Sequence, residues 1–114
     1  MSQLTRKEAD NMFSVFTTKR LVLRLINSGQ SNLSDKQDVL VGDAFAMAYK
    51  LLKYAQQKQN IELFKRVYEA TKELVPSEQI KSVMKYPEMY EKMVRIKQYF
   101  VEDAALLAQK MCIR

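Results

Sequence analysis

Residues 87–112, PEMYEKMVRIKQYFVEDAALLAQKMC, decide the fold class of this chain. The apolar side chains in this stretch recur every three or four residues, which is the repeat of one face of an α-helix. They are Met89, Met93, Ile96, Phe100, Ala104, Leu107 and Met111. Pro87 suits the first turn of a helix, where a missing amide proton costs no hydrogen bond. The stretch therefore predicts a long amphipathic helix.

A second long helix is predicted over residues 35–59. A capping box from Ser34 to Gln37 marks its start, and two adjacent faces of the helix are apolar at once. One face carries Leu40, Ala44, Met47, Leu51 and Tyr54, and the other carries Val41, Phe45, Ala48, Leu52 and Ala55. A helix with so broad an apolar surface is contacted on both sides, so we expect 35–59 and 87–112 to form the core pair.

The first segment, residues 5–29, is also predicted to be helical. It opens with a capping box from Thr5 to Glu8, and Gly29 suits the left-handed residue that follows a helix. Its apolar positions are Ala9, Met12, Phe13, Phe16, Leu21, Leu23, Leu25 and Ile26. Thr17 and Thr18 leave open whether this is one helix or two. A strand over 20–26 is rejected, because the chain has no second strand to pair with it.

A third helix is predicted over 61–75, ended by Pro76, and a short piece over 77–85 leads to the last helix. Glycine and proline together make up only four of the 114 residues, which favours long helices with few turns. The prediction is an all-α fold, a compact bundle of four or five helices with two long core helices, in a single domain over 1–114.

Missing residue types exclude several kinds of chemistry. The chain has no histidine, which excludes His-containing zinc sites and catalysis by Ser-His-Asp or Cys-His groups. Cys112 is the only cysteine, so no disulfide within the chain and no cysteine metal cage can form. With only Gly29 and Gly42, neither a P-loop nor a dinucleotide-binding loop can be built. We predict no enzyme activity, no cofactor and no metal.

The sequence carries no signal for a membrane or for secretion. No apolar run approaches the roughly 18 residues of a membrane span, and no continuous apolar stretch follows the first basic residues. A location in the cytoplasm, or elsewhere inside the cell, is the prediction.

Lys and Arg outnumber Asp and Glu by 19 to 13, a net charge of +6 that would attract phosphate backbones or acidic proteins. If residues 5–29 form two short helices, they have the proportions of a helix-turn-helix, although Asp10 and Ser14 fit that motif poorly. Lys19, Arg20 and Arg24 would then point from the second helix towards DNA. The alternative is one amphipathic helix whose cations merely extend into solvent.

A second basic stretch, 81–97, mixes Lys85, Lys92, Arg95 and Lys97 with Tyr86 and Tyr90, a composition that suits single-stranded nucleic acid or an acidic partner. Met84 with Tyr86 and Tyr90 is the predicted apolar contact surface for a partner, because methionine side chains adapt to the groups they meet.

Many of the charged side chains are expected to lie on solvent-exposed faces of the helices and to pair there. Three glutamates lie four residues before a cation, as in Glu62–Arg66, Glu88–Lys92 and Glu91–Arg95. Asp43 and Asp103 are the acidic residues within otherwise apolar helices. A buried Asp103 needs a cationic partner, and Arg20 is the expected one.

Because no catalytic constellation is present, the sequence favours a small regulatory protein that binds another macromolecule, most simply a protein, through a helical surface. The alternative is a basic protein that binds DNA or RNA through the cationic helix faces. Association of the chain with itself is left open.

Overall fold

Four α-helices and two 3₁₀ helices make up the part of the chain that a computed structural model describes, residues 4–29, 37–84 and 86–111. They are α1 (Arg6–Asn27), α2 (Gln37–Gln57), α3 (Ile61–Ala70), η2 (Thr71–Glu73), η3 (Glu78–Val83) and α4 (Pro87–Lys110). No strand occurs in these three ranges, and the all-α prediction is confirmed.

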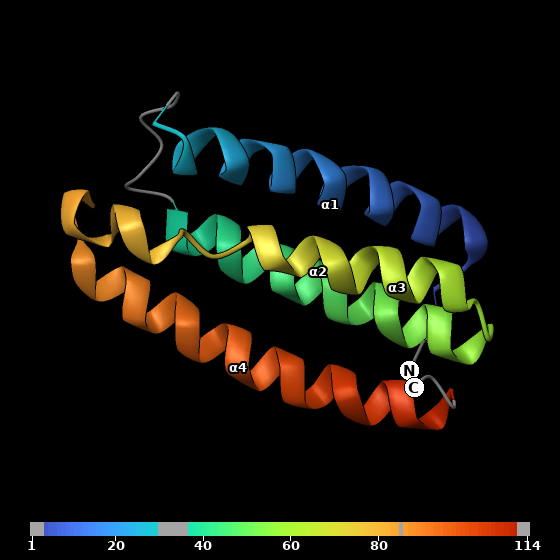
Figure 1. Ribbon diagram of the computed structural model, residues 1–114. Coiled ribbons are helices and arrows are strands. Elements are labelled where there is room, and N and C mark those ends of the chain that lie inside the picture. Colours follow the sequence, from blue (N-terminus) through green and yellow to red (C-terminus); the bar gives the residue numbers. More distant parts are fainter. Residues whose placement is uncertain (1–3, 30–36, 85, 112–114) are drawn as a thin grey trace.

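The helix α2 lies at the centre and packs against α1, α3 and α4. In Figure 1, α1 and α4 lie on either side of α2, and α3 crosses in front of it. Both apolar faces predicted for this helix are used, since Val41, Ala44, Ala48, Leu51 and Leu52 have no exposed surface. The beginning of the predicted helix, at Ser34 and Asp35, lies outside the described residues.

The helix α4 buries the stripe from which the fold was predicted. Met93, Phe100, Ala104, Leu107 and Met111 are all buried, and Pro87 occupies its first turn. The ring of Phe100 packs at a tilt on Phe45 of α2, with 5.1 Å between the ring centres. This contact fixes α4 against the central helix. Cys112, at the end of the predicted helix, lies outside the described residues.

The helix α1 is a single helix of 22 residues, so the two-helix alternative is wrong. The hydroxyl groups of Thr17 and Thr18 donate hydrogen bonds to the carbonyl oxygens of Phe13 and Ser14, which lets both residues stay inside the helix. The predicted capping box is present, and Gly29 has the predicted left-handed backbone, with φ of 78°.

Because α1 is as long as α2, which has 21 residues, the description of two long core helices is incomplete. Phe16, Leu23 and Ile26 of α1 are buried against the rest of the core. Leu21 and Leu25, which we expected on the apolar face, are 45% exposed, because their positions fall on the opposite side of the helix from Phe16.

The helix α3 ends at Ala70, five residues earlier than predicted. The Thr71 hydroxyl donates a hydrogen bond of 2.6 Å to the carbonyl oxygen of Tyr68, and the chain tightens into η2. The turn before α3 has no glycine: Gln59 takes a left-handed backbone with φ of 53°, and the Asn60 side chain caps the helix by accepting from the Leu63 amide.

Candidate functional site

The helix α3 has a hollow on each side, one towards α4 and one towards α1. It packs on α2, but neither α1 nor α4 packs closely along its length. In Figure 1, α3 runs antiparallel to α4 and parallel to α1, so the beginnings of α1 and α3 lie at the same end of the molecule. We call the first hollow the α3/α4 groove and the second the α1/α3 pocket.

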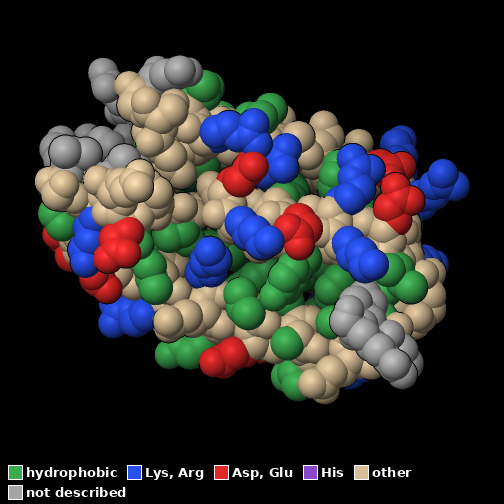
Figure 2. Space-filling view, in the orientation of Figure 1, with side chains coloured by type: hydrophobic (Ala, Val, Ile, Leu, Met, Phe, Trp, Pro, Cys, Tyr) green, Lys and Arg blue, Asp and Glu red, His purple; other side chains and the backbone are tan. Residues whose placement is uncertain are grey.

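The α3/α4 groove has a volume of about 540 Å³. Its lining consists of Phe64, Lys65, Tyr68, Glu69, Ala105, Ala108 and Gln109. In Figure 2, hydrophobic side chains gather in a hollow below α3, while charged side chains form a row along α3 itself. The groove therefore combines an apolar floor with a charged edge.

Two aromatic residues and two alanines form the apolar part of the groove. Phe64 is buried and Tyr68 is half-buried, and their rings stack with 6.4 Å between the centres. On the facing helix, Ala105 is exposed and Ala108 is half-buried. Because alanine side chains are so short, α4 does not fill the space beside the two rings.

The charged residues that line the groove are Lys65 and Glu69, both on α3. At helical spacing, one stripe of α3 and η2 carries Ile61, Lys65, Tyr68 and Lys72, and one stripe of α4 carries Lys97, Val101, Ala105 and Ala108. Neither stripe contains an acidic residue. Glu69 also lines the groove, but Lys72 lies 2.9 Å from its carboxylate, and this contact raises the pKa of Lys72.

Within the described ranges, no ion pair, side-chain hydrogen bond or ring contact joins α3 to α4. Towards α1 the connections are ionic. Glu73 of η2 accepts a hydrogen bond of 2.6 Å from Arg24 and lies 3.7 Å from Arg20, both on α1. The guanidinium of Arg66 lies over the Phe13 ring, 5.3 Å from its centre. The α1 side of α3 is thus held by several polar contacts that the α4 side lacks.

The expected pair of Arg20 with Asp103 is wrong. Asp103 is exposed on α4, and Arg20 approaches Glu73 instead. Asp43 is exposed as well, 3.6 Å from Lys19. Neither aspartate is a buried carboxylate, because each faces outward from its helix.

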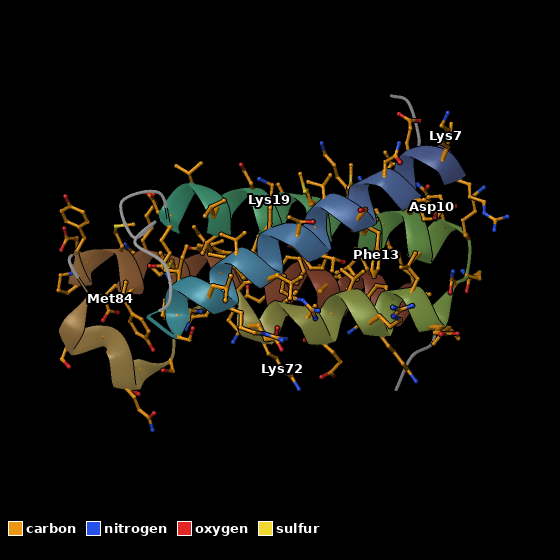
Figure 3. The ribbon with its side chains drawn as sticks, turned by 90° about the horizontal axis from the view of Figure 1, so that it is seen from above. Lys7, Asp10, Phe13, Lys19, Lys72 and Met84 are labelled. Atoms are coloured by element: carbon orange, nitrogen blue, oxygen red, sulfur yellow. The ribbon has the colours of Figure 1, made fainter. Side chains whose placement is uncertain are left out.

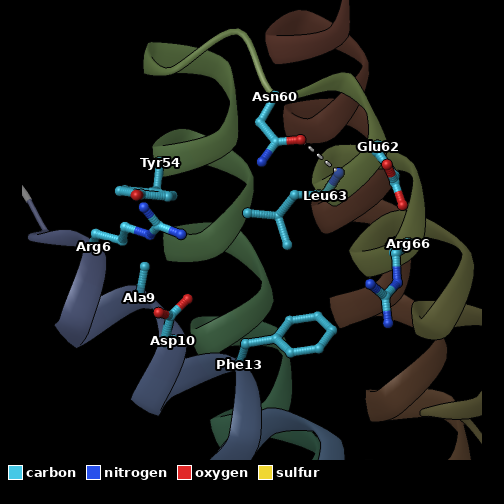
Figure 4. A pocket seen from close by; sticks show the side chains of 9 residues that line it. All are labelled: Arg6, Ala9, Asp10, Phe13, Tyr54, Asn60, Glu62, Leu63 and Arg66. Atoms are coloured by element: carbon cyan, nitrogen blue, oxygen red, sulfur yellow. Dashed lines mark hydrogen bonds between the residues drawn. The ribbon is translucent and has the colours of Figure 1, made fainter.

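The α1/α3 pocket has a volume of about 440 Å³ and lies at the end where α1 and α3 begin (Figure 4). Its lining consists of Arg6, Ala9, Asp10, Phe13, Tyr54, Asn60, Glu62, Leu63 and Arg66. The Leu63 and Phe13 side chains extend into it, and Arg6 lies beside the Tyr54 ring. Charged groups of both signs therefore surround an apolar floor.

The cations predicted to bind nucleic acid do not form one surface. Lys19 of α1 (Figure 3) lies 3.6 Å from Asp43 of α2. Arg20 and Arg24 instead come together at Glu73. On α4, Lys92 lies 3.5 Å from Asp38 of α2, and Arg95 is exposed. The helix-turn-helix hypothesis is wrong, because α1 is a single helix.

The predicted apolar surface lies at the junction of η3 and α4. Met84 and Tyr90 are half-buried, and Tyr86 is exposed. The Lys81 ammonium lies 5.2 Å from the centre of the Tyr90 ring and forms an ion pair with Glu91, which lowers the pKa of that carboxyl group. Figure 3 shows Met84 at this end of the molecule, far from the labelled Asp10. Lys85 lies outside the described residues.

None of the three glutamate–cation pairs expected from helical spacing is an ion pair among the described residues. Glu91 and Lys92 instead bind partners on other elements, Lys81 and Asp38. The sequence analysis missed the α3/α4 groove altogether. The signal that could have revealed it is the absence of acidic residues from the stripe through Lys65 and Tyr68, together with the closely spaced alanines of α4.

Comparisons with protein-family models, with curated proteins and with solved structures found no match for this chain. In the part of the chain that the structure describes, no helix is long and apolar enough to cross a membrane, and no three potential metal ligands of the His, Cys, Asp or Glu type lie together.

Proposed function

We propose that the protein is a small, non-enzymatic interaction protein whose α3/α4 groove binds an amphipathic, acidic α-helix of a partner protein. The observation that carries the proposal is an apolar floor, with Lys65 at its edge, between two helices that no ion pair, side-chain hydrogen bond or ring contact links among the described residues. We take the chain as one helical domain in which the core pair α2 and α4 supports the groove, and we expect the partner inside the cell.

The shape of the groove suits a helix. The ten residues of α3 span about 15 Å, and α4 continues antiparallel beside it, so a partner helix of about three turns would lie along both walls. An apolar stripe on that helix would cover the rings of Phe64 and Tyr68 and contact Ala105. Binding of an amphipathic helix in a hydrophobic groove is a common mode of peptide recognition.

The charge of the walls determines the chemistry of the partner. Lys65 lines the groove, and Lys97 lies on α4 about two turns before Ala105, beyond the lining; within the described residues no acidic group forms an ion pair with either. Lys72 lies 2.9 Å from the Glu69 carboxylate and offsets part of the negative charge that Glu69 presents to a partner. Acidic residues beside the partner's apolar stripe would therefore be attracted, and lysines there would be repelled.

Binding of nucleic acid is the alternative function, and the experiment must distinguish it from binding of a partner helix. Lys19, Arg20, Arg24 and Lys92 each lie near a carboxylate of another element, which reduces the positive charge that they offer to a phosphate backbone. DNA or RNA binding remains a prediction from composition.

Fluorescence anisotropy with labelled probes tests the proposal. The probes are a helix-forming peptide of about 18 residues with a leucine stripe flanked by glutamates, the same peptide with lysines for glutamates, a sequence-scrambled acidic peptide, and duplex and single-stranded DNA. The acidic amphipathic peptide should bind at least about tenfold more tightly than the other probes. No binding of this peptide, or tighter binding of DNA, would overturn the proposal.

Two double variants that remove the same charge at different places test whether peptide binding depends on the groove. Lys65→Gln with Lys97→Gln should weaken binding of the acidic peptide about tenfold. Lys50→Gln with Lys53→Gln removes the same charge from exposed positions of α2 and should leave binding nearly unchanged. Equal losses in the two double variants would show that only net charge matters, which contradicts a groove.

A further inference from the structure

The α1/α3 pocket lies on the other side of α3 from the proposed partner groove and has its own lining. Its volume of about 440 Å³ falls in the range of small-molecule sites, which is roughly 300 to 1,000 Å³. No residue lines both hollows. Any ligand of this pocket would therefore be independent of the partner helix.

The floor of the pocket is apolar. Ala9 is buried, and Phe13, Tyr54 and Leu63 are half-buried, so each presents only part of its hydrocarbon surface. Figure 4 shows Ala9, Phe13 and Leu63 extending towards the same space from two helices. A hydrocarbon group of a few carbon atoms would cover this surface and remove it from water.

Each wall carries one cation and one anion, one helical turn apart. Arg6 and Asp10 stand on α1, and Glu62 and Arg66 stand on α3. Among the described residues none of these four takes part in an ion pair, although Asp38, Asp43, Glu69, Glu73 and Glu91 all do. The four charges sum to zero, so the lining gives no net attraction to a simple anion or cation but offers partners of both signs to a ligand that carries both.

The two ends of the pocket differ in polarity. Arg6 and Asn60 lie where α1 and α3 begin, and the Asn60 side-chain oxygen already accepts from the Leu63 amide, so its NH₂ group remains as a donor. The positive ends of both helix dipoles lie there too, which favours a carboxylate. Asp10 lies one turn, about 5.4 Å, further along α1, so a small ligand between the two side chains can meet Arg6 with its carboxylate and Asp10 with its ammonium group.

We propose that the α1/α3 pocket binds a free α-amino acid with an apolar side chain. The ligand carboxylate receives hydrogen bonds from Arg6 and Asn60, its ammonium group donates to Asp10, and its side chain covers Leu63 and Phe13. Binding then needs three features of the ligand at once: the carboxylate, the ammonium group and the apolar side chain.

Amide chemical shifts of the ¹⁵N-labelled full chain, titrated with L-leucine, test this inference. Three analogues each lack one feature: N-acetyl-leucine lacks the ammonium charge, leucinamide lacks the carboxylate, and glycine lacks the side chain. Leucine should shift the amide signals of Ala9 and Leu63, and each analogue should bind at least about tenfold more weakly. No shift with leucine, or comparable affinity for any one analogue, would overturn the assignment.

Two variants of exposed pocket residues test the roles of the walls. Arg6→Gln and Asp10→Asn should each weaken leucine binding about tenfold while the circular dichroism spectrum stays helical. Lys7→Gln is the matched control, because Lys7 lies in the same turn of α1 but does not line the pocket. An equal loss in Lys7→Gln, or no loss in either pocket variant, would contradict the proposed contacts.

Discussion

The helix α3 meets its two neighbours in opposite ways. Towards α1, Glu73 connects η2 to Arg20 and Arg24, and Arg66 lies over the Phe13 ring. Towards α4, the described residues show no such connection, and alanines face aromatic rings across an open groove. The position of α3 is thus set by α2 and α1, while its α4 side contributes little to holding it.

This difference shows where apolar surface stays exposed in the described part of the molecule, namely between α3 and α4. Exposed apolar area next to fixed helices costs stability in water and is common where a partner binds. On the α1 side the ion pairs of Glu73 lie beyond the end of α3, in η2, whereas Arg66 and Phe13 line the α1/α3 pocket nearer its beginning. The two hollows therefore differ in chemistry as well as position: the lining of the groove is mostly apolar with two charged residues, whereas four charged residues line the pocket.

The largest loss of stability is expected from a substitution in α2, the central helix on which α1, α3 and α4 all pack. Leu51 of α2 is fully buried, so Leu51→Ala should lower the free energy of unfolding by about 2–5 kcal/mol through lost burial and a cavity. Urea denaturation followed by circular dichroism measures this change. A loss below about 1 kcal/mol would mean that α2 is not the common support.

An acidic residue in the groove should abolish partner binding without unfolding the chain. Ala105 is exposed on the α4 wall, so Ala105→Glu places a carboxylate where the acidic peptide would lie and should weaken its binding more than about tenfold. Ala46→Glu makes the same change at an exposed position of α2 and serves as control. If both variants bind the peptide as the wild type does, the groove is not the binding surface.

A smaller effect is expected from the ionic connection to α1. Glu73→Gln removes the carboxylate that Arg20 and Arg24 share, and should cost about 0.5–1 kcal/mol, because all three side chains are partly exposed. The loss should shrink at high salt, where exposed charges are screened. Glu102→Gln, at an exposed site with no ion pair among the described residues, should change stability less in the same thermal melts.

The smallest effect concerns the cap at the beginning of α1, next to the α1/α3 pocket. The Thr5 backbone amide donates to the Glu8 carboxylate at 3.1 Å, which lowers the pKa of that group below 4.5. A carboxyl group whose pKa falls on folding stabilises the protein above its unfolded pKa, and this contribution disappears as the pH falls through the folded pKa.

Glu8→Gln keeps a side chain that can complete the capping box but removes the titrating charge. The wild type should therefore melt slightly higher than this variant at neutral pH, and the difference should disappear as the pH falls below 4.5 through the lowered pKa of Glu8. A difference that is the same at neutral pH and below that pKa would show that the charge of Glu8 does not contribute.

Local patterns predicted the helices because each depends on residues close together in the chain. Most of the stripe from Met89 to Met111 and of the broad apolar surface of α2 is buried, and the rest is half-buried against the core. Thr5, Pro87 and Gly29 mark helix ends where they were predicted. The exposure of Leu25 shows the limit of this approach, because an apolar residue does not reveal which neighbour is there to cover it.

Contacts between helices could not be predicted in the same way. Arg24 and Glu73 are 49 residues apart, and only the packing of η2 against α1 brings them together. Helical spacing paired Lys92 with Glu88, whereas the neighbouring helix offers Asp38. The α3/α4 groove could not be predicted for the same reason. Its walls come from α3 and α4, and their relative position depends on how both helices pack on α2.

The most direct test of the central claim is to map peptide contacts on the ¹⁵N-labelled protein by NMR. Addition of the acidic amphipathic peptide should shift amide signals of the α3/α4 groove, above all those of Lys65, Tyr68, Ala105 and Ala108, and leave those of Ala9 and Asp10 in place. Shifts confined to α1, or shifts spread evenly over every exposed lysine, would contradict the claim that the open side of α3 is the partner-binding surface.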